Sequence, residues 1–195
     1  MTLQKMATRT IPKRRCNEVY NMKTALVTGS SRGIGRAIAI RLAKDGYKVI
    51  VHGAGNVQKA EETKQIIEQN GGVAIVEMAD LCNVEETKAL AERIGKVDIL
   101  VLNASLQYDT YLEDISADDM LSHYTCNAVS SLLLVQHFVP FMKEQKWGRI
   151  VTVGSVNEKK PIPKLMAYSM SKAAQTNMAL SLASQLAEYG ITVNN

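Results

Sequence analysis

The chain has 195 residues, of which 46% are hydrophobic and 22% charged, with 12 glycines and 4 prolines. This composition excludes a disordered chain and a fibrous protein, and it predicts one globular domain with a hydrophobic core. The formal net charge is +4, but five of the 23 basic and one of the 19 acidic side chains lie within residues 1–21. The rest of the chain is close to neutral, which argues against a nucleic-acid-binding domain.

Residues 1–21 form a basic segment whose composition differs from that of the rest. The segment lacks the apolar stretch of a secretory signal and has only a weak similarity to an organelle transit peptide. We favour a simpler interpretation, in which it is a disordered tail or precedes a true translation start at Met22. Binding of nucleic acid through this segment is the least favoured hypothesis.

The chain has no uninterrupted run of 18 apolar residues, so we expect no membrane span. Three cysteines, Cys16, Cys82 and Cys126, are odd in number and lack the spacing of a metal or redox motif. The histidines are scattered and also lack metal-ligand spacing. We therefore expect a cytoplasmic protein with free thiols and no metal site.

Short β-branched segments alternate with longer segments of helical periodicity from Met22 onward. The pattern predicts strands at 24–28, 48–52, 73–77, 98–102, 149–153 and 191–193. Helices are predicted to begin near Gly33, Val57, Asn83, Ala117 and Lys164, and to end near glycines 46, 71, 95, 148 and 190. This alternation predicts an α/β domain with a doubly wound parallel sheet of the Rossmann type, which binds ligands at the carboxyl ends of its strands.

Residues 22–195 show one composition and no internal repeat, so we expect a single dinucleotide-binding domain. The sixth predicted strand begins only a few residues before Asn195. We therefore expect the last strand to be incomplete and the C-terminal portion of the domain to be missing.

A glycine-rich loop, Gly29-Ser30-Ser31-Arg32-Gly33-Ile34-Gly35, follows the first predicted strand. Such a loop can be a simple turn, but a strand before it and an amphipathic helix after it are the context of a phosphate site. Glycines let the backbone approach a pyrophosphate closely. The N-terminus of the following helix stabilises the negative charge of that pyrophosphate. We expect the cofactor contacts to include Gly29, Ser31, Arg32, Gly33, Ile34 and Gly35.

The end of the second predicted strand indicates which dinucleotide is used. A carboxylate there would bind the ribose of NAD and repel the 2′-phosphate of NADP, and residues 49–55 contain none. Arg32 is a candidate partner for that phosphate, although it is equally explained as a solvated loop residue. The sequence favours NADP over NAD.

Tyr168 and Lys172 lie four residues apart in a predicted helix and so share one of its faces. This spacing is frequent by chance, and its ordinary explanation is a surface tyrosine packed on a lysine stem. Ser155, at the end of the fifth predicted strand, is close enough in sequence to come near Tyr168. Asn127 lies in an apolar part of a long predicted helix, where a buried amide satisfied by the backbone is the alternative explanation.

Taken in order and spacing, these motifs resemble the short-chain dehydrogenase/reductase family over residues 22–195. The spacing Thr28-Gly29-x-x-x-Gly33-x-Gly35 is similar to the single-domain branch, which includes members of the 3-oxoacyl-acyl-carrier-protein reductase type. The other residues that carry the resemblance are Asp80, Leu81, Asn103, Ala104, Asn127, Ser155, Tyr168 and Lys172.

The resemblance implies hydride transfer between NADP(H) and a small-molecule ketone or secondary alcohol, with a 3-oxoacyl thioester as one candidate. Lys172 would favour the phenolate of Tyr168 and hold the nicotinamide ribose, so that Tyr168 can exchange a proton with the substrate oxygen. Ser155 would hydrogen-bond the substrate carbonyl, and Asn127 would hold a water that connects Lys172 to solvent.

The resemblance also implies that Asp80 and Leu81 flank the adenine, that Asn103 and Ala104 line the cofactor, and that full-length members form homo-oligomers. Ser105 stands where the family usually has glycine, and the chain ends where family members continue. A second hypothesis is therefore a truncated, catalytically inactive nucleotide-binding fragment or pseudo-enzyme of the same fold.

Overall fold

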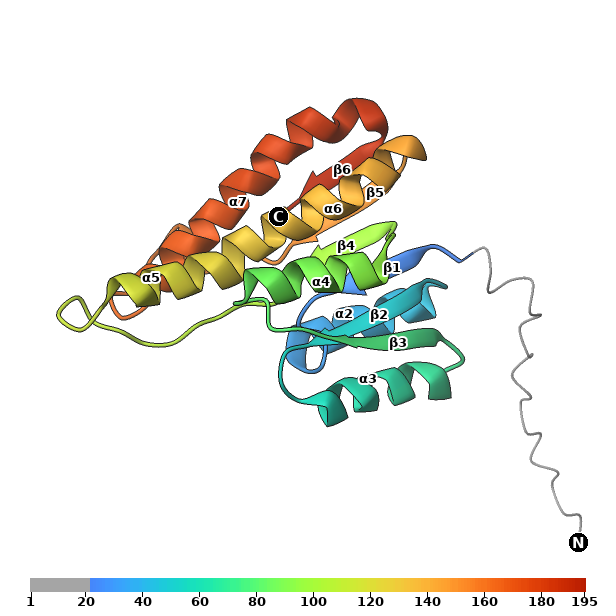
Figure 1. Ribbon diagram of the computed structural model, residues 1–195, viewed down its shortest axis with the longest axis horizontal. Helices are drawn as coiled ribbons and strands as arrows, with labels where there is room; N and C mark the ends of the chain where they lie inside the picture. The colour runs from blue at the N-terminus through green and yellow to red at the C-terminus, as the bar shows by residue number, and fades with distance from the viewer. Residues whose placement is uncertain (1–21) are drawn as a thin grey trace, which may run out of the picture.

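A computed structural model describes residues 22–195 (Figure 1). Six parallel strands form one sheet in the order β3-β2-β1-β4-β5-β6, which confirms the predicted doubly wound α/β fold. The strands are β1 (Thr24–Val27), β2 (Lys48–Gly53), β3 (Val73–Met78), β4 (Ile99–Leu102), β5 (Gly148–Thr152) and β6 (Ile191–Asn194). The predicted basic segment, including Cys16, lies outside the described residues.

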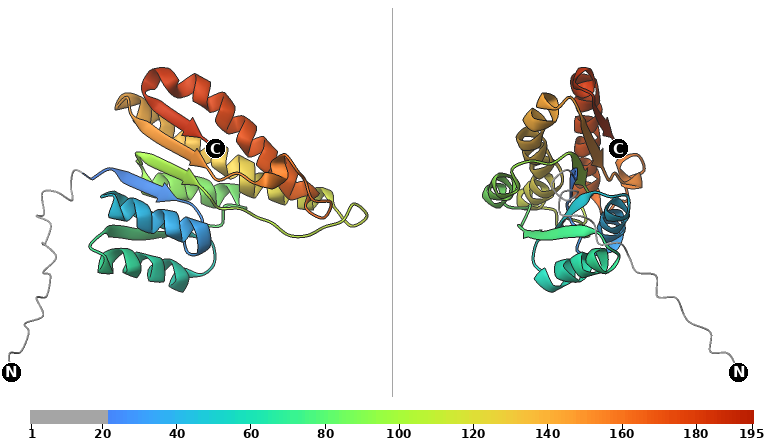
Figure 2. Two further views of the ribbon diagram at one scale, coloured as in Figure 1. Left: turned by 180° about the vertical axis from the view of Figure 1, so that it is seen from behind. Right: turned by 90° about the vertical axis from the view of Figure 1, so that its right-hand side faces the viewer.

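The connections are helical, as predicted. The helices are α2 (Gly33–Lys44), α3 (Val57–Gln69), α4 (Val84–Ile94), α5 (Ala117–Tyr124), α6 (Ser130–Glu144) and α7 (Met166–Leu186), with short turns η1 (Thr125–Val129), η2 (Val156–Glu158) and η3 (Ala187–Tyr189). Helices α2 and α3 cover one face of the sheet, and α4, α6 and α7 lie on the other (Figure 2). Both faces are therefore buried for much of the sheet, as expected for parallel strands.

Two hydrophobic clusters occupy the two faces of the sheet. In β1, Ala25 and Val27 pack toward one cluster and Leu26 toward the other, because successive side chains of a strand point to opposite faces. Leu26, Leu100 and Phe138 are fully buried in the larger cluster. The strand order reverses between β1 and β4, which places the switch point of the fold between their carboxyl ends.

Local sequence signals fix several helix ends. Asn56 and Asn83 cap α3 and α4, and Ser116 forms a capping box with Asp119 at the start of α5. Gly148 lies after the end of α6 and at the start of β5, as predicted. The backbone turns at Lys146, with φ 53°, and Gly148 opens β5 in close contact with Met142.

The long helix predicted from Ala117 is divided by a π-helical turn. Residues Thr125–Val129 form η1 between α5 and α6, and Asn127 lies inside this turn. A π turn inserts one extra residue in the helical hydrogen-bond pattern and is frequent at functional sites. Periodicity did not reveal it, because the apolar spacing continues on both sides.

Taken together, Ala117–Glu144 is a helical stretch long and apolar enough to cross a membrane by composition alone. Half of its most apolar window is buried inside the domain, where α6 packs on α4 and α7. The core helix of a globular protein has the same properties, so the stretch is weak evidence for a span.

Strand β6 forms the edge of the sheet and pairs with β5 from Gly148–Ile191 to Val151–Asn194. Of the β5 side chains, Ile150 is buried against the larger cluster, whereas Val151 on the other face is 36% exposed. The sheet is thus less covered over β5 than over β1.

His52 joins the carboxyl ends of three strands. Its Nδ1 accepts a hydrogen bond of 3.0 Å from the Gly29 N–H, so the ring proton lies on Nε2, which donates to the Ala79 carbonyl at 3.1 Å. The ring is 1% exposed. His52 therefore ties the loop after β1 to the end of β3, and it can do so only as the neutral imidazole.

This geometry predicts a loss of stability in acid. Burial lowers the pKa of His52 from 6.5 to about 4, so the unfolded state takes up a proton at a higher pH than the folded state. The contribution of His52 to the free energy of unfolding is complete above 6.5, the pKa of the ring in the unfolded chain. This contribution falls as the pH drops toward the pKa of the folded protein, by about 3 kcal/mol in total. Denaturant unfolding of the wild type and of His52→Gln, at pH 7 and pH values down to 4, measures this difference.

The control is His137→Gln, because His137 is half-buried and outside this network. We expect His137→Gln to keep the pH dependence of the wild type and His52→Gln to reduce it. Equal pH dependence in all three proteins would contradict the role of His52.

Candidate active site

A cavity of about 820 Å³ opens at the switch point, above the carboxyl ends of β1, β2 and β4. The cavity is lined by every cofactor contact that was predicted in the glycine loop and after the third and fourth strands. These residues are Gly29, Ser31, Arg32, Gly33, Ile34, Gly35, Asp80, Leu81, Asn103 and Ala104. The tertiary structure thus brings together segments that are separated by up to 75 residues.

Two glycines in the loop are required by space. Gly29 has φ +64°, and a Cβ atom there would lie 2.9 Å from the Ala104 Cα. A Cβ atom on Gly35 would lie 2.5 Å from the Gly29 carbonyl oxygen, so helix α2 begins in direct contact with the loop. The N-terminus of α2 consequently faces the cavity, where its unpaired N–H groups favour an anion.

Thr28 and Asn103 lock the loop to β4. The Thr28 hydroxyl donates to the Val101 carbonyl and accepts from the N–H groups of Asn103 and Ala104 at 2.9 and 3.0 Å. The Asn103 amide in turn donates to the carbonyls of Thr28 and Gly29 at 2.9 and 3.1 Å. Much of the hydrogen-bonding capacity of Asn103 is therefore used to shape the cavity.

Arg36 is a structural residue of the site that the sequence did not reveal. Its guanidinium donates two hydrogen bonds, of 3.1 and 2.6 Å, to the Ser31 carbonyl and a third, of 2.9 Å, to the Thr63 hydroxyl. Arg36 thereby holds the glycine loop against α3. Its position in the first turn of the helix after the loop was the available signal, but only the packing of α3 supplies the partner.

The charges around the cavity are asymmetric. Arg32 and Lys59 are exposed and line it near the end of β2, where the wall consists of His52, Gly53 and Ala54 without a carboxylate. Lys59 was not among the predicted contacts. Asp80, which follows β3, is the acidic lining residue.

Cys82 and Cys126 also line the cavity and are free thiols in the described part of the chain. Burial raises the pKa of both thiols, so both are neutral at pH 7. Residues 22–195 contain no group of three or more metal-ligating side chains.

Tyr168 and Lys172 lie one turn apart on α7 and are both buried, with 8% and 1% exposure. The Lys172 ammonium donates to the Val153 carbonyl, just after β5, and to the Gln175 Oε1, each at 2.5 Å. Burial lowers the pKa of Lys172 from 10.5 to about 8, so the side chain is still charged at pH 7. Residues four apart on a helix share one of its faces, so α7 presents Tyr168 and Lys172 on the same side.

Ser155 lies three residues after the end of β5 and caps the η2 turn. Its hydroxyl accepts a hydrogen bond of 3.2 Å from the Asn157 N–H, which leaves the hydroxyl proton available to another acceptor. Ser155, Tyr168 and Lys172 are not lining residues of the large cavity. They belong to the segment from β5 to α7, where Lys172 contacts the end of β5.

Asn127 is fully buried in the η1 turn, and its side chain makes three hydrogen bonds. Its Oδ1 accepts from the Leu106 N–H at 2.7 Å, and its Nδ2 donates to the Leu106 carbonyl at 3.0 Å and to the Ser171 hydroxyl at 2.9 Å. This is the environment of a buried amide satisfied mainly by the backbone. Asn127 thus connects the segment after β4 to α7.

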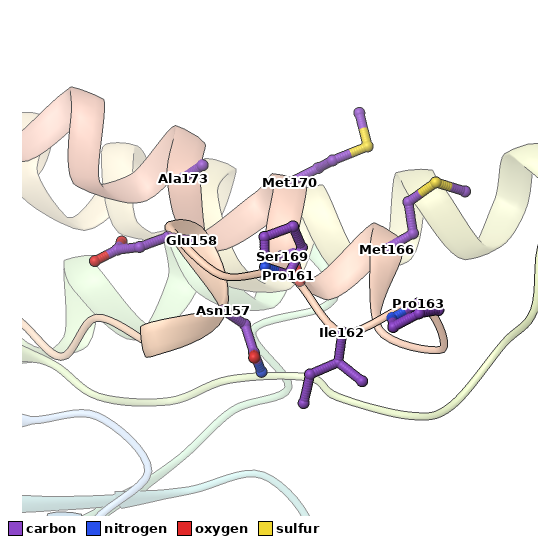
Figure 3. A pocket seen from close by; sticks show the side chains of 9 residues that line it. All are labelled: Asn157, Glu158, Pro161, Ile162, Pro163, Met166, Ser169, Met170 and Ala173. Atoms are coloured by element: carbon purple, nitrogen blue, oxygen red, sulfur yellow. The ribbon is translucent and has the colours of Figure 1, made fainter.

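A second cavity, of about 390 Å³, lies between the loop after η2 and the first turns of α7 (Figure 3). Its lining is mostly apolar, with Pro161, Ile162, Met166, Met170 and Ala173 among the residues. Two buried polar atoms on this cavity have no hydrogen-bond partner among the described residues, namely Asn157 Oδ1 and Ser169 Oγ. Both residues belong to the segment from the cap of η2 to α7 that also carries Ser155 and Tyr168, although neither of those two residues lines this cavity.

Comparison with known proteins agrees with this geometry. The family described as short chain dehydrogenase matches residues 23–195. A 3-oxoacyl-[acyl-carrier-protein] reductase of Staphylococcus aureus is 35% identical over 176 residues, which cover 88% of this chain and 72% of the relative.

Two solved structures extend the comparison. A 3-oxoacyl (acyl-carrier-protein) reductase of Agrobacterium tumefaciens with NADP bound has a TM-score of 0.82 and 37% identity, covering 91% of this chain and 70% of that chain. A landomycin C-6 ketoreductase with bound NADP and rabelomycin has a TM-score of 0.83 and 34% identity, covering 88% and 74%. The hypothesis of a catalytically inactive pseudo-enzyme finds no support among them. The chain belongs to the short-chain dehydrogenase family of NAD(P)-dependent oxidoreductases.

Proposed function

We propose that this oxidoreductase uses NADP(H) to interconvert a ketone and a secondary alcohol. The observation that carries the proposal is the buried pair of Tyr168 and Lys172 on one face of α7, joined by Lys172 to the end of β5. Ser155 follows β5, and the dinucleotide-sized cavity lies at the adjacent switch point. The carboxyl end of the sheet thus provides a proton donor, a hydroxyl that can bind a carbonyl and a site for a nucleotide.

The cavity residues fit a dinucleotide phosphate. The N–H groups at the start of α2 and the space over Gly29 and Gly35 would receive the pyrophosphate, and Asp80 and Leu81 would flank the adenine. Arg32 and Lys59 would pair with a 2′-phosphate. The end of β2 has no carboxylate that would repel this phosphate. NADP(H) bound there supplies or accepts the hydride.

The chain's own residues handle the proton and the developing charge. Ser155 donates a hydrogen bond to the substrate carbonyl oxygen, and Tyr168 donates its phenolic proton to the same oxygen as the carbonyl carbon is reduced. Lys172 stabilises the resulting phenolate, because its ammonium is charged and desolvated on the same helical face. Asn127 supports this arrangement from η1, and its predicted contact with a relay water remains part of the proposal.

For the substrate, we infer a ketone with an apolar arm, such as a 3-oxoacyl thioester. The arm would occupy the cavity beside α7, whose volume of about 390 Å³ suits an alkyl chain. Two of the relatives are named as reductases of 3-oxoacyl groups.

A cytoplasmic location and a homo-oligomeric assembly remain predictions.

The first prediction concerns the proton donor. Tyr168→Phe removes the phenolic proton and is expected to reduce kcat for NADPH-dependent ketone reduction by about a thousandfold, while Ser155→Ala reduces it about a hundredfold. Tyr189→Phe in η3, remote from the site, is the matched control and keeps wild-type activity. NADPH absorbance with a panel of ketones measures the rates, and equal activity of Tyr168→Phe and the control would refute the mechanism.

The second prediction concerns the choice of cofactor. Arg32→Ala and Lys59→Ala each remove a cation from the cavity and are expected to raise the Kd for NADPH about tenfold without changing the Kd for NADH. The exposed Lys44→Ala, at the far end of α2, is the control. Fluorescence titration of both dinucleotides measures the effect. A parallel loss of NADH affinity would mean that these residues do not contact the 2′-phosphate.

The third prediction concerns the apolar cavity. Ala173→Phe fills it and is expected to lower kcat/KM for long-chain ketones by tenfold or more, while changing kcat/KM for butanone by less than about twofold. Leu180→Phe places the same ring on the exposed surface of α7 and serves as control. If Ala173→Phe affects short and long ketones equally, the substrate arm lies elsewhere.

A further inference from the structure

The Lys172 ammonium is buried without a carboxylate partner. None of the ion pairs among residues 22–195 includes it, and its two hydrogen-bond acceptors are neutral oxygens. An ammonium has three N–H donors and no acceptor, so two donors are used by Val153 and Gln175 and one is left over. The groups that hold the first two N–H donors of Lys172 therefore also set the direction of the third.

Gln175 is the side-chain member of this pair of acceptors, and its own orientation is fixed. It is fully buried, lies three residues after Lys172 on the same face of α7, and donates from Nε2 to the Ser131 hydroxyl at 2.8 Å. Ser131 donates its only proton to the Asn127 carbonyl at 3.1 Å, so toward Gln175 it can only accept. The Gln175 amide must therefore present its nitrogen to Ser131 and its oxygen to Lys172.

We propose that Gln175 is a positioning residue for Lys172, which holds the ammonium in place through a hydrogen-bond chain that ends at the π-helical turn. The inference rests on the proposed function, because the one remaining N–H of Lys172 is the donor left for the reacting groups, either the Tyr168 oxygen or the cofactor ribose. The Asn127 carbonyl in η1 accepts the Ser131 proton, which sets the direction of every bond up to Lys172.

The charged and titratable groups around Lys172 come from three elements. Glu158 in η2 raises the pKa of Lys172, as does Cys126 in η1, and Tyr168 lies on α7 itself. Burial dominates and lowers this pKa to about 8. Removing the Gln175 oxygen would remove one of two compensating acceptors and so lower the pKa further, whereas a carboxylate in the same place would raise it.

The test compares three variants with the wild type. Gln175→Met keeps the length of the side chain without the acceptor, and Gln175→Glu replaces the amide by an isosteric carboxylate. Gln185→Met makes the same change on the exposed part of the same helix and is the matched control. Lysine labelled with ¹³C at Cε, assigned with Lys172→Met, reports the pKa of Lys172 by NMR without any turnover.

We expect the pKa of Lys172 to fall by about one unit in Gln175→Met, to rise in Gln175→Glu and to stay unchanged in Gln185→Met. At pH 8 the charged fraction then falls about fivefold in Gln175→Met, and the rate of ketone reduction falls with it. The alkaline limb of the pH–rate profile shifts down for Gln175→Met and up for Gln175→Glu.

An unchanged Lys172 pKa in both Gln175 variants would overturn the inference. If Gln175→Met fails to fold, the direction of the shift in Gln175→Glu decides alone. A wild-type protein that reduces no ketone would instead overturn the proposed function, since the NMR titration does not depend on activity.

Discussion

The site depends on one buried cation. Moving the Lys172 ammonium out of water is costly and lowers its pKa to about 8, while the charge of Glu158 raises this pKa. Two fixed oxygens accept N–H groups of the ammonium. Those oxygens come from β5 and from α7, and the latter is oriented through the π turn after α5. The ammonium is thus held by contacts that join α7 to the end of β5 and to the start of α6.

The nucleotide cavity is built on a separate set of hydrogen bonds. His52, Thr28 and Asn103 bind the glycine loop to the ends of β2, β3 and β4 through their side chains. The loop is therefore preorganised by strands that are not its sequence neighbours, and its N–H groups need no rearrangement to receive an anion. Each half of the site is rigid, and the parallel sheet sets the distance between them.

Much of the fold could be predicted from the sequence, because the relevant signals are local. β-branched runs placed all six strands within about two residues, and caps such as Asn83 and Ser116 act within one turn. The glycine loop was recognisable since its spacing reflects backbone geometry at one place. The turn at Lys146 before Gly148 was not predicted, because lysine carries no sequence signal for a left-handed conformation.

Residue types and spacing by themselves determined a doubly wound α/β domain, a phosphate loop without an acidic partner, and a Tyr168–Lys172 pair on one helical face. Only the tertiary structure decided what holds these groups. Arg36 and Gln175 acquire their partners from elements far away in sequence, and Lys59 lines the cavity only through the position of α3. The hydrogen bonding of Asn127 and Asn103 depends on which backbone groups lie opposite them. Hydrogen bonds between distant elements depend on packing, which periodicity along the chain does not encode.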